Sequence, residues 1–291
     1  MKSSMLQSTH RGALLLVRDS PESISGQAMW PLKTKYKHMK KSNDHTNGIV
    51  IEFDSGIIPP PYSHVYRLAL DWNGSELIAE LELHYTDREE LTVDEILDEG
   101  FTAKDDFSFK GTLDYVWKKV VSIEFEKTKW SGRQLDEGGL TLSVLEDGKT
   151  GAAKAPTDQE GWQMLAQDVI QAIYETSKKE APLTVNYRQV TNEESIECSI
   201  TMNFSNREAV LVSKNNSRII NWEYAVQLMK LVFSPDYNYD IAKETAGNLR
   251  GSYIECGDGY WHELGKGVVN IDTSFDAVGK IKDGFENLIE E

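Results

Sequence analysis

With 291 residues, 40% of them hydrophobic and seven of them tryptophan, the chain is long enough to bury a sizeable core and too apolar for a disordered protein. Its formal net charge of −16 argues against broad binding to nucleic acid or anionic lipid and favours basic partners. One of its longest apolar runs, Ala13–Val17, is far shorter than the roughly 18 to 20 residues that cross a bilayer and unlike a typical signal peptide. We therefore expect a cytoplasmic protein without a transmembrane segment.

The first 48 residues form a basic segment. Residues 1–45 hold eight Lys/Arg and three Asp/Glu, a net charge of +5, so the remainder carries −21. Arg11–Arg18 is read as one short strand. Lys33–Lys41 could be a solvent-facing strand whose lysines protect a sheet edge, or could pair with the acidic body. It could also bind phosphate or anionic lipid through Lys35 and Lys37. We favour the structural interpretations.

The next stretch predicts a strand, a connector and a hairpin. Gly48–Phe53 is read as a strand and Ile57–Tyr62 as an extended connector. His64–Tyr85 alternates in hydrophobicity around Asn73-Gly74, a pair typical of a two-residue turn. That turn predicts that Leu70 pairs with Leu77. One face would then hold Tyr66, Leu68, Leu70, Leu77, Leu81 and Leu83.

The rest of the first half is predicted to contain helices and strands in alternation. Thr92 and Glu95 suggest a capping box for a short helix, although Thr86–Glu89 could form another box or a turn. Tyr115–Phe125 reads as a strand by its alternation, and Leu140–Leu145 as another. Thr157–Glu160 matches a capping box that opens a longer amphipathic helix.

A second half begins after Ala181-Pro182. We expect a hairpin over Leu183–Phe204, a third strand at Ala209–Val212 and a helix from Trp222 to Phe233. A further hairpin is expected at Gly251–Cys256 and Tyr260–Leu264, followed by a short strand at Val268–Ile271 and a C-terminal helix from Ser274.

These elements predict an α+β protein of two tandem modules. Each module would be an antiparallel meander or hairpin sheet packed against helices, at residues 49–180 and 181–291, after the basic segment 1–48. Thr86–Glu89 resembles Ser205–Glu208 at an offset of 119, which hints at an internal duplication. In the best-aligned window, Ser75–Leu91 against Glu194–Val210, only Arg88/Arg207 and Glu89/Glu208 are identical, so duplication is a hypothesis that the sequence leaves open.

Candidate chemistry concentrates in Cys256–Glu263. His262, Glu263 and Cys256 could combine a base, an acid and a nucleophile in a catalytic site. Tyr260 and Trp261 could instead form an exposed tip that binds a partner. The Gly-Asp-Gly turn and strand-forming aromatics also explain the segment as plain structure, which we favour. His64 and His84 are predicted to face opposite sides of the hairpin, so we expect no metal site and no cofactor.

The sequence favours a non-enzymatic, acidic adaptor that recognises a protein partner, and its net charge of −16 favours a basic one. The alternatives are a hydrolase with a site in the cleft between the halves, and a binder of anionic lipid or phosphate through residues 33–41. Walker A, G-x-G-x-x-G, G-x-S-x-G and H-E-x-x-H motifs are absent. With only Cys198 and Cys256, the chain is unlike a disulfide-rich secreted scaffold.

Overall fold

The computed structural model describes residues 47–72, 74–132, 135, 137–214 and 216–290. Within them lie two six-stranded antiparallel sheets and five α-helices, which confirms the predicted α+β fold of two modules. The basic segment, including Lys35 and Lys37, lies outside the described residues except for its last two positions. No helix in the described ranges is long and apolar enough to cross a membrane.

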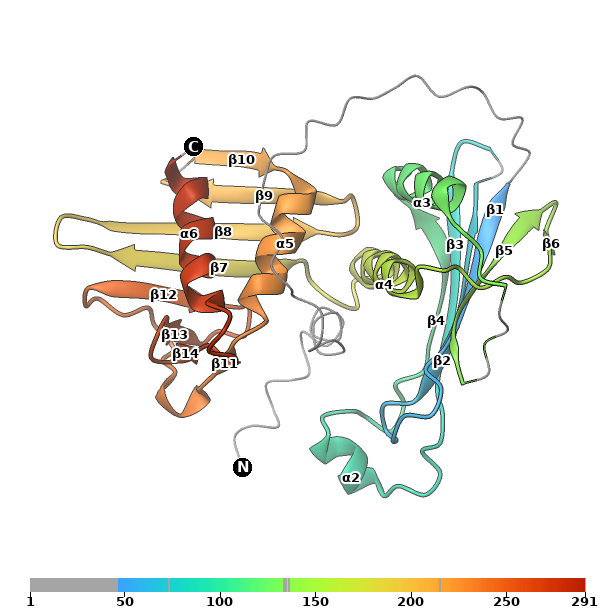
Figure 1. Cartoon of the computed structure of the whole chain (residues 1–291), viewed down its shortest axis with the longest axis horizontal. Coiled ribbons are helices and arrows are strands. Elements are labelled where there is room, and N and C mark those ends of the chain that lie inside the picture. The colour runs from blue at the N-terminus through green and yellow to red at the C-terminus, as the bar shows by residue number, and fades with distance from the viewer. Residues whose placement is uncertain (1–46, 73, 133–134, 136, 215, 291) are drawn as a thin grey trace.

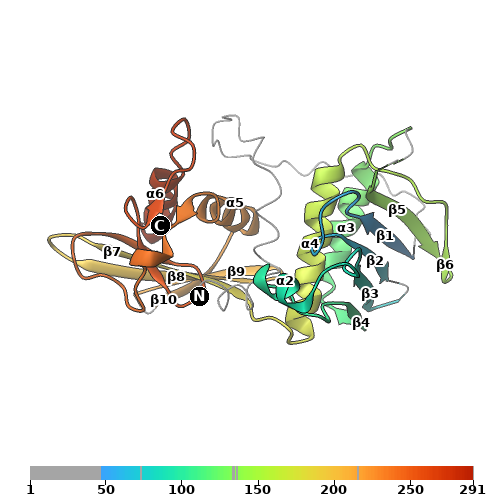
Figure 2. The same ribbon diagram turned by 90° about the horizontal axis from the view of Figure 1, so that it is seen from below.

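The first sheet has the strand order β4-β3-β2-β1-β5-β6. Its strands are β1 Gly48–Asp54, β2 His64–Asp71, β3 Leu77–Tyr85, β4 Phe107–Leu113, β5 Gly139–Glu146 and β6 Lys149–Thr150. Helices α2 Val93–Asp98, α3 Val116–Lys127 and α4 Gln159–Thr176 follow β3, β4 and β6 respectively. Figures 1 and 2 show α3 and α4 as a layer between this sheet and the second module.

The second sheet has the order β10-β9-β8-β7-β12-β13. Its strands are β7 Leu183–Val190, β8 Ser195–Asn203, β9 Glu208–Ser213, β10 Asn216–Ile220, β12 Gly251–Glu255 and β13 Trp261–Glu263. Helices α5 Trp222–Val232 and α6 Ala277–Glu290 cover one of its faces (Figure 2). The 3₁₀ helix η1 Tyr239–Ile241 and a ribbon of β11 Asp236–Tyr237 and β14 Val268–Val269 complete the module.

The two sheets share one topology. In each, four consecutive strands form a meander, a helix follows, and the next strand of the same sheet, β5 or β12, returns to pair with the first strand of the meander. By this order β7 and β8 correspond to β1 and β2. The sequence pattern matches the hairpin Leu183–Phe204 (β7 and β8) to the hairpin His64–Tyr85 (β2 and β3). By strand order, β7 and β8 match β1 and β2 instead, so that match is displaced by one strand. Arg88 and Arg207 follow strands that do not correspond, and duplication stays a hypothesis supported by the shared strand order.

In the first hairpin, each side chain lies on the predicted face of the sheet, but the two strands pair in a different register. Leu70 pairs with Ala79 and Leu68 with Leu81, rather than Leu70 with Leu77. The loop between β2 and β3 is longer than two residues, and the Trp72 amide donates to the Asn47 carbonyl at 2.7 Å. A shift of two residues leaves every side chain on its own face because strand side chains alternate with period two. All six residues predicted on the inner face are accordingly buried.

The prediction of a strand over Tyr115–Phe125 was wrong, because this segment is α3. Its buried residues Trp117 and Val121 are four apart, as on a helix, and Ile123, which would share their face in a strand, is exposed. The cap of α4 also differs by one position: Asp158, rather than Thr157, accepts from the Gly161 amide. The Gln159 side chain, next to this cap, bonds the Leu140 backbone of β5.

The main hydrophobic core runs through both modules, and Val50, Ala69 and Leu145 form a second, small cluster. At their junction the Trp117 indole on α3 donates to the Phe204 carbonyl at 2.9 Å, and the Glu175 carboxylate on α4 accepts from the Ser205 amide at 2.9 Å. The Arg207 guanidinium lies 5.3 Å from the Trp222 ring centre. The predicted division at residues 180 and 181 falls in the loop between α4 and β7.

Candidate functional site

The connection between β3 and β4 forms an acidic lobe, residues 86–106, that projects from one end of the first sheet (Figure 1). It holds nine Asp/Glu against Arg88 and Lys104, a net charge of −7. Helix α2 lies within it and begins at the predicted capping box, with the Thr92 and Glu95 side chains each bonded to the other's backbone. The capping box fixes the start of a helix too short to be stable alone.

Arg88 holds the lobe against the sheet. Its guanidinium donates from Nε and Nη2 to the Pro61 carbonyl at 3.0 and 2.8 Å, and from Nη1 to the Asp105 carboxylate at 2.9 Å. It also lies over the Tyr85 and Phe101 rings, 3.9 and 4.8 Å from their centres. One planar cation therefore joins the β1–β2 connector, the end of β3 and the far side of the lobe.

The lobe and the adjoining connector expose large apolar side chains. Val93 and Leu97, one turn apart on α2, are 55% and 47% exposed, while Ile96 between them is buried in the protein. The connector adds Ile57 and Ile58, and Tyr62, which is hydrogen bonded to Glu99 at the end of α2. We call Ile57, Ile58, Tyr62, Val93 and Leu97 the apolar tip. Exposed apolar groups with a polar rim are typical of protein interaction sites.

Local hydrogen bonds keep two carboxyl groups of the lobe ionised. Burial alone would raise the pKa of Asp105, but hydrogen bonds from Thr102 and Arg88 outweigh it and lower that pKa. The His84 ring and the Tyr85 amide, both 2.9 Å away, lower the pKa of Asp106. The lobe therefore stays negative at neutral pH, so it attracts cationic groups.

Of the three predicted catalytic residues, Cys256 and His262 both contact Tyr237, whereas Glu263 points away from them. Glu263 pairs with Lys266 at 2.7 Å and is adjacent to His262 in β13, so the two side chains point to opposite faces. The Cys256 thiol is 3.5 Å from the Tyr237 hydroxyl, and burial raises its pKa to about 12. A thiol protonated at neutral pH is a poor nucleophile.

His262 is packed as a core aromatic residue. Only 2% of it is exposed, and its ring contacts those of Tyr237 and Tyr239 edge-on at centroid distances of 5.1 and 4.9 Å. Burial lowers the pKa of His262, although Asp258 and the Asn238 backbone oppose this effect. The ring is therefore held neutral by its surroundings.

The predicted binding tip is partly covered. Tyr260 and Trp261 are half-buried, and the Trp261 backbone bonds that of Lys243 in both directions, at 2.7 and 3.1 Å. Lys35 and Lys37 lie outside the described residues. His64 and His84 are on adjacent strands at positions of opposite parity, and the described residues contain no group of three or more His, Cys, Asp or Glu that could hold a metal ion.

The sequence carries one local signal for the apolar tip. Val93 and Leu97 are four apart within an otherwise acidic segment, a spacing that predicts a short helix together with Ile96 and Phe101. The role of Arg88 was not visible, because its partners are spread from Pro61 to Asp105.

Comparison of the chain with protein-family models, with curated proteins and with solved structures found no match.

Proposed function

We propose that the chain is a non-enzymatic, acidic binding protein of the cytoplasm whose acidic lobe and apolar tip dock a basic, apolar segment of a partner protein. The observation that carries this proposal is the exposure of Val93 and Leu97 at 55% and 47% on a lobe of net charge −7. Apolar anchors supply buried area in a complex, and the surrounding carboxylates select a cationic partner and speed the encounter.

The clamp by Arg88 supports a docking role for the tip. A loop that must become ordered on binding loses affinity to the entropy of ordering, whereas a pre-ordered surface avoids that cost. Arg88 and the Thr92–Glu95 capping box order the lobe in the absence of any partner. The apolar tip is thus presented on a fixed backbone.

The test compares capture of partners by the wild-type chain and by the double variant Val93→Ser/Leu97→Ser. The variant should lose its salt-sensitive protein partner, by about tenfold or more in affinity if the two side chains act as anchors. Ile241→Ser/Leu249→Ser is the matched control, since these residues are 52% and 79% exposed on the second module. This control should retain the partner.

A purified probe separates charge from apolar contact. A synthetic amphipathic peptide with lysine and leucine should bind the wild-type chain, and its counterpart with glutamate in place of lysine should not. Equal binding of both peptides, or equal partner capture by both double variants, contradicts the proposal.

The alternatives predict other results. A hydrolase built on His262 would lose a measured activity in His262→Ala, although Glu263 and His262 face opposite sides of β13. Binding of anionic lipid or phosphate through Lys35 and Lys37 would be lost on charge reversal of those residues and would be unaffected by the Val93/Leu97 variant.

A further inference from the structure

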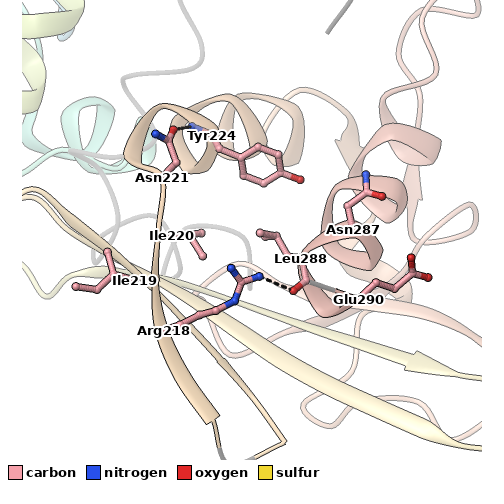
Figure 3. Close-up of a pocket in the computed structure, with 8 residues that line it drawn as sticks. All are labelled: Arg218, Ile219, Ile220, Asn221, Tyr224, Asn287, Leu288 and Glu290. Carbon is pink, nitrogen blue, oxygen red and sulfur yellow. Dashed lines mark hydrogen bonds between the residues drawn. The ribbon is translucent and has the colours of Figure 1, made fainter. Parts of the chain in front are cut away.

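Two surfaces of the protein combine apolar and polar side chains, and they differ in what the polar groups already bind. One is a groove between β10, the start of α5 and the last turns of α6. Figure 3 shows Arg218 donating to the Leu288 carbonyl at 2.9 Å and the Asn221 side chain accepting from the Tyr224 amide at 2.8 Å. These polar side chains are therefore used by the fold of the second module. The other surface is the exposed side of α2.

Helix α2 carries two parallel rows of exposed side chains. Val93 and Leu97 form an apolar row, and Asp94 and Asp98 form an acidic row. Within each row the residues are one turn apart, a rise of about 6 Å, and the rows are offset by about 100° around the helix axis. Ile96 projects opposite to the acidic row and is buried in the protein. The acidic row therefore lies on the solvent side of the apolar row.

The carboxylates of the acidic row have no task inside the protein. Four other acids of the lobe are bonded to capping, tyrosine, arginine or histidine groups: Glu95, Glu99, Asp105 and Asp106. The Asp94 and Asp98 carboxylates make no hydrogen bond or ion pair with another residue of the described chain. They can therefore bind cationic groups of a partner without breaking a bond of the lobe.

Two neighbouring rows of different chemistry favour a helical partner. A strand directs successive side chains to opposite faces, so it presents only one row to a surface. A helix presents rows at positions i, i+4 and i+1, i+5 side by side, with the same spacing as the rows on α2. An amphipathic helix can therefore place apolar residues on the apolar row and basic residues on the acidic row at the same time.

We propose that the acidic row of α2 selects the partner, and that the docked segment is an α-helix with a row of Lys or Arg beside a row of apolar residues. This inference rests on the proposed function, because it assigns the partner's contacts within the same lobe. Asp94 and Asp98 pair with the basic row, while Val93 and Leu97 contact the apolar row. Carboxylates elsewhere in the lobe contribute only longer-range attraction, which salt screens over about 8–10 Å.

The first test uses two alanine-rich helical peptides of identical composition. In one, a lysine directly follows each of two leucines that are one turn apart; in the other, both lysines are moved one position further, to the opposite side of the helix. The first peptide should bind the wild-type chain more tightly by roughly fivefold or more. A proline between its leucines, which breaks the helix, should abolish binding. Equal binding of the two isomers, or undiminished binding of the proline peptide, overturns the proposal.

The second test removes the acidic row. Asp94→Asn/Asp98→Asn should weaken binding of the first peptide by roughly five- to tenfold, because two contact ion pairs are lost. Asp87→Asn/Glu89→Gln removes the same charge from exposed positions of the lobe outside α2 and should change binding by less than about twofold. Asp94→Glu/Asp98→Glu should keep most of the affinity, which separates loss of charge from disturbance of the helix. Equal weakening by the two neutralised variants contradicts a contact role for the row.

Charge reversal completes the experiment. Asp94→Lys/Asp98→Lys should reject the lysine peptide and bind its counterpart with glutamate at the same positions, because the exchange restores the contacts with opposite signs. Failure of this exchange overturns the pairing. Val93→Ser/Leu97→Ser tests the proposed function separately. If that variant loses the lysine peptide while Asp94→Asn/Asp98→Asn binds like wild type, docking on the apolar tip stands and selection by the acidic row is refuted. If Val93→Ser/Leu97→Ser binds the peptide like wild type, the proposed function itself fails.

Discussion

Burial raises the pKa of the Asp168 carboxyl group, on α4, to about 7, although the nearby charges of Arg207 and Lys230 favour its ionised form. Lys230, on α5, also approaches Met164 of α4, with Nζ 3.6 Å from the thioether sulfur. A carboxyl group at the junction of two modules therefore changes its charge near neutral pH.

The sign of the effect on stability follows from the two states. The unfolded carboxyl titrates near pH 4 and the folded one near pH 7, so between these values the folded state retains a proton that the unfolded state releases. The stability that this group contributes at acid pH is lost as the pH rises to 7.

We expect Asp168→Asn to remove that decline. The free energy of unfolding of the variant should exceed that of wild type by about 1–3 kcal/mol at pH 8, and the difference should vanish near pH 4. The expected gain is small because Arg207 and Lys230 lose a charged partner in the variant. Urea denaturation of both chains from pH 4 to 8 measures it. Asp98→Asn, on the exposed face of α2, is the control. A constant difference between Asp168→Asn and wild type at all pH values would refute the assignment.

At the scale of elements, the acidic lobe depends on one side chain more than on its own helix. Helix α2 has six residues and buries only Ile96, so its internal hydrogen bonds cannot hold it in place. The contacts of Arg88 with Pro61, Thr102 and Asp105 supply the restraint.

We expect Arg88→Ala to lower the free energy of unfolding of the lobe by about 2–3 kcal/mol, because charged hydrogen bonds are lost and Asp105 keeps its buried charge. Hydrogen exchange of residues 86–106 should accelerate, and binding of the basic amphipathic peptide should weaken. Arg67→Ala should change little, by about 0.5 kcal/mol or less, since its ion pair with Glu52 is long, at 4.0 Å, and exposed. Unchanged exchange in Arg88→Ala would show that the lobe is ordered by other contacts.

In the whole molecule, contacts at the junction between the two modules couple the stability of one module to that of the other. Trp117 is fully buried in α3, and its indole is bonded to Phe204 at the end of β8. Phe204 in turn packs edge-on against Trp222 at the start of α5, with ring centres 5.0 Å apart. A change at Trp117 therefore reaches two elements of the second module.

Trp117→Phe keeps an aromatic ring and removes the indole donor, which leaves the buried Phe204 carbonyl without this bond. We expect a loss of about 1–3 kcal/mol in the free energy of unfolding. Exchange should accelerate at residues 204–207 as well as in α3, which tests the coupling. Trp130→Phe is the control, since Trp130 is 40% exposed. Faster exchange confined to the first module would contradict coupling through Trp117.

Periodic and local signals in the sequence determined many elements by themselves. Alternation placed Tyr66, Leu68 and Leu70 on a buried face even with the wrong pairing register, because a shift of two preserves the face. The capping box at Thr92, the Leu183–Phe204 hairpin and the C-terminal helix were likewise predictable from residues near one another in the chain.

Only the tertiary structure decided what depends on distant partners. Over Tyr115–Phe125 both periods fit several apolar residues, and packing against the sheet and Phe204 selects the helix that buries Trp117 and Val121. The correspondence of β7 with β1 depends on which strands pair in each sheet. The clamp by Arg88 depends on Pro61 and Asp105, which are 27 and 17 positions away in the chain. Local sequence specifies which face of an element is apolar, whereas the choice of neighbour depends on the shape and hydrogen bonding of surfaces that exist only after folding.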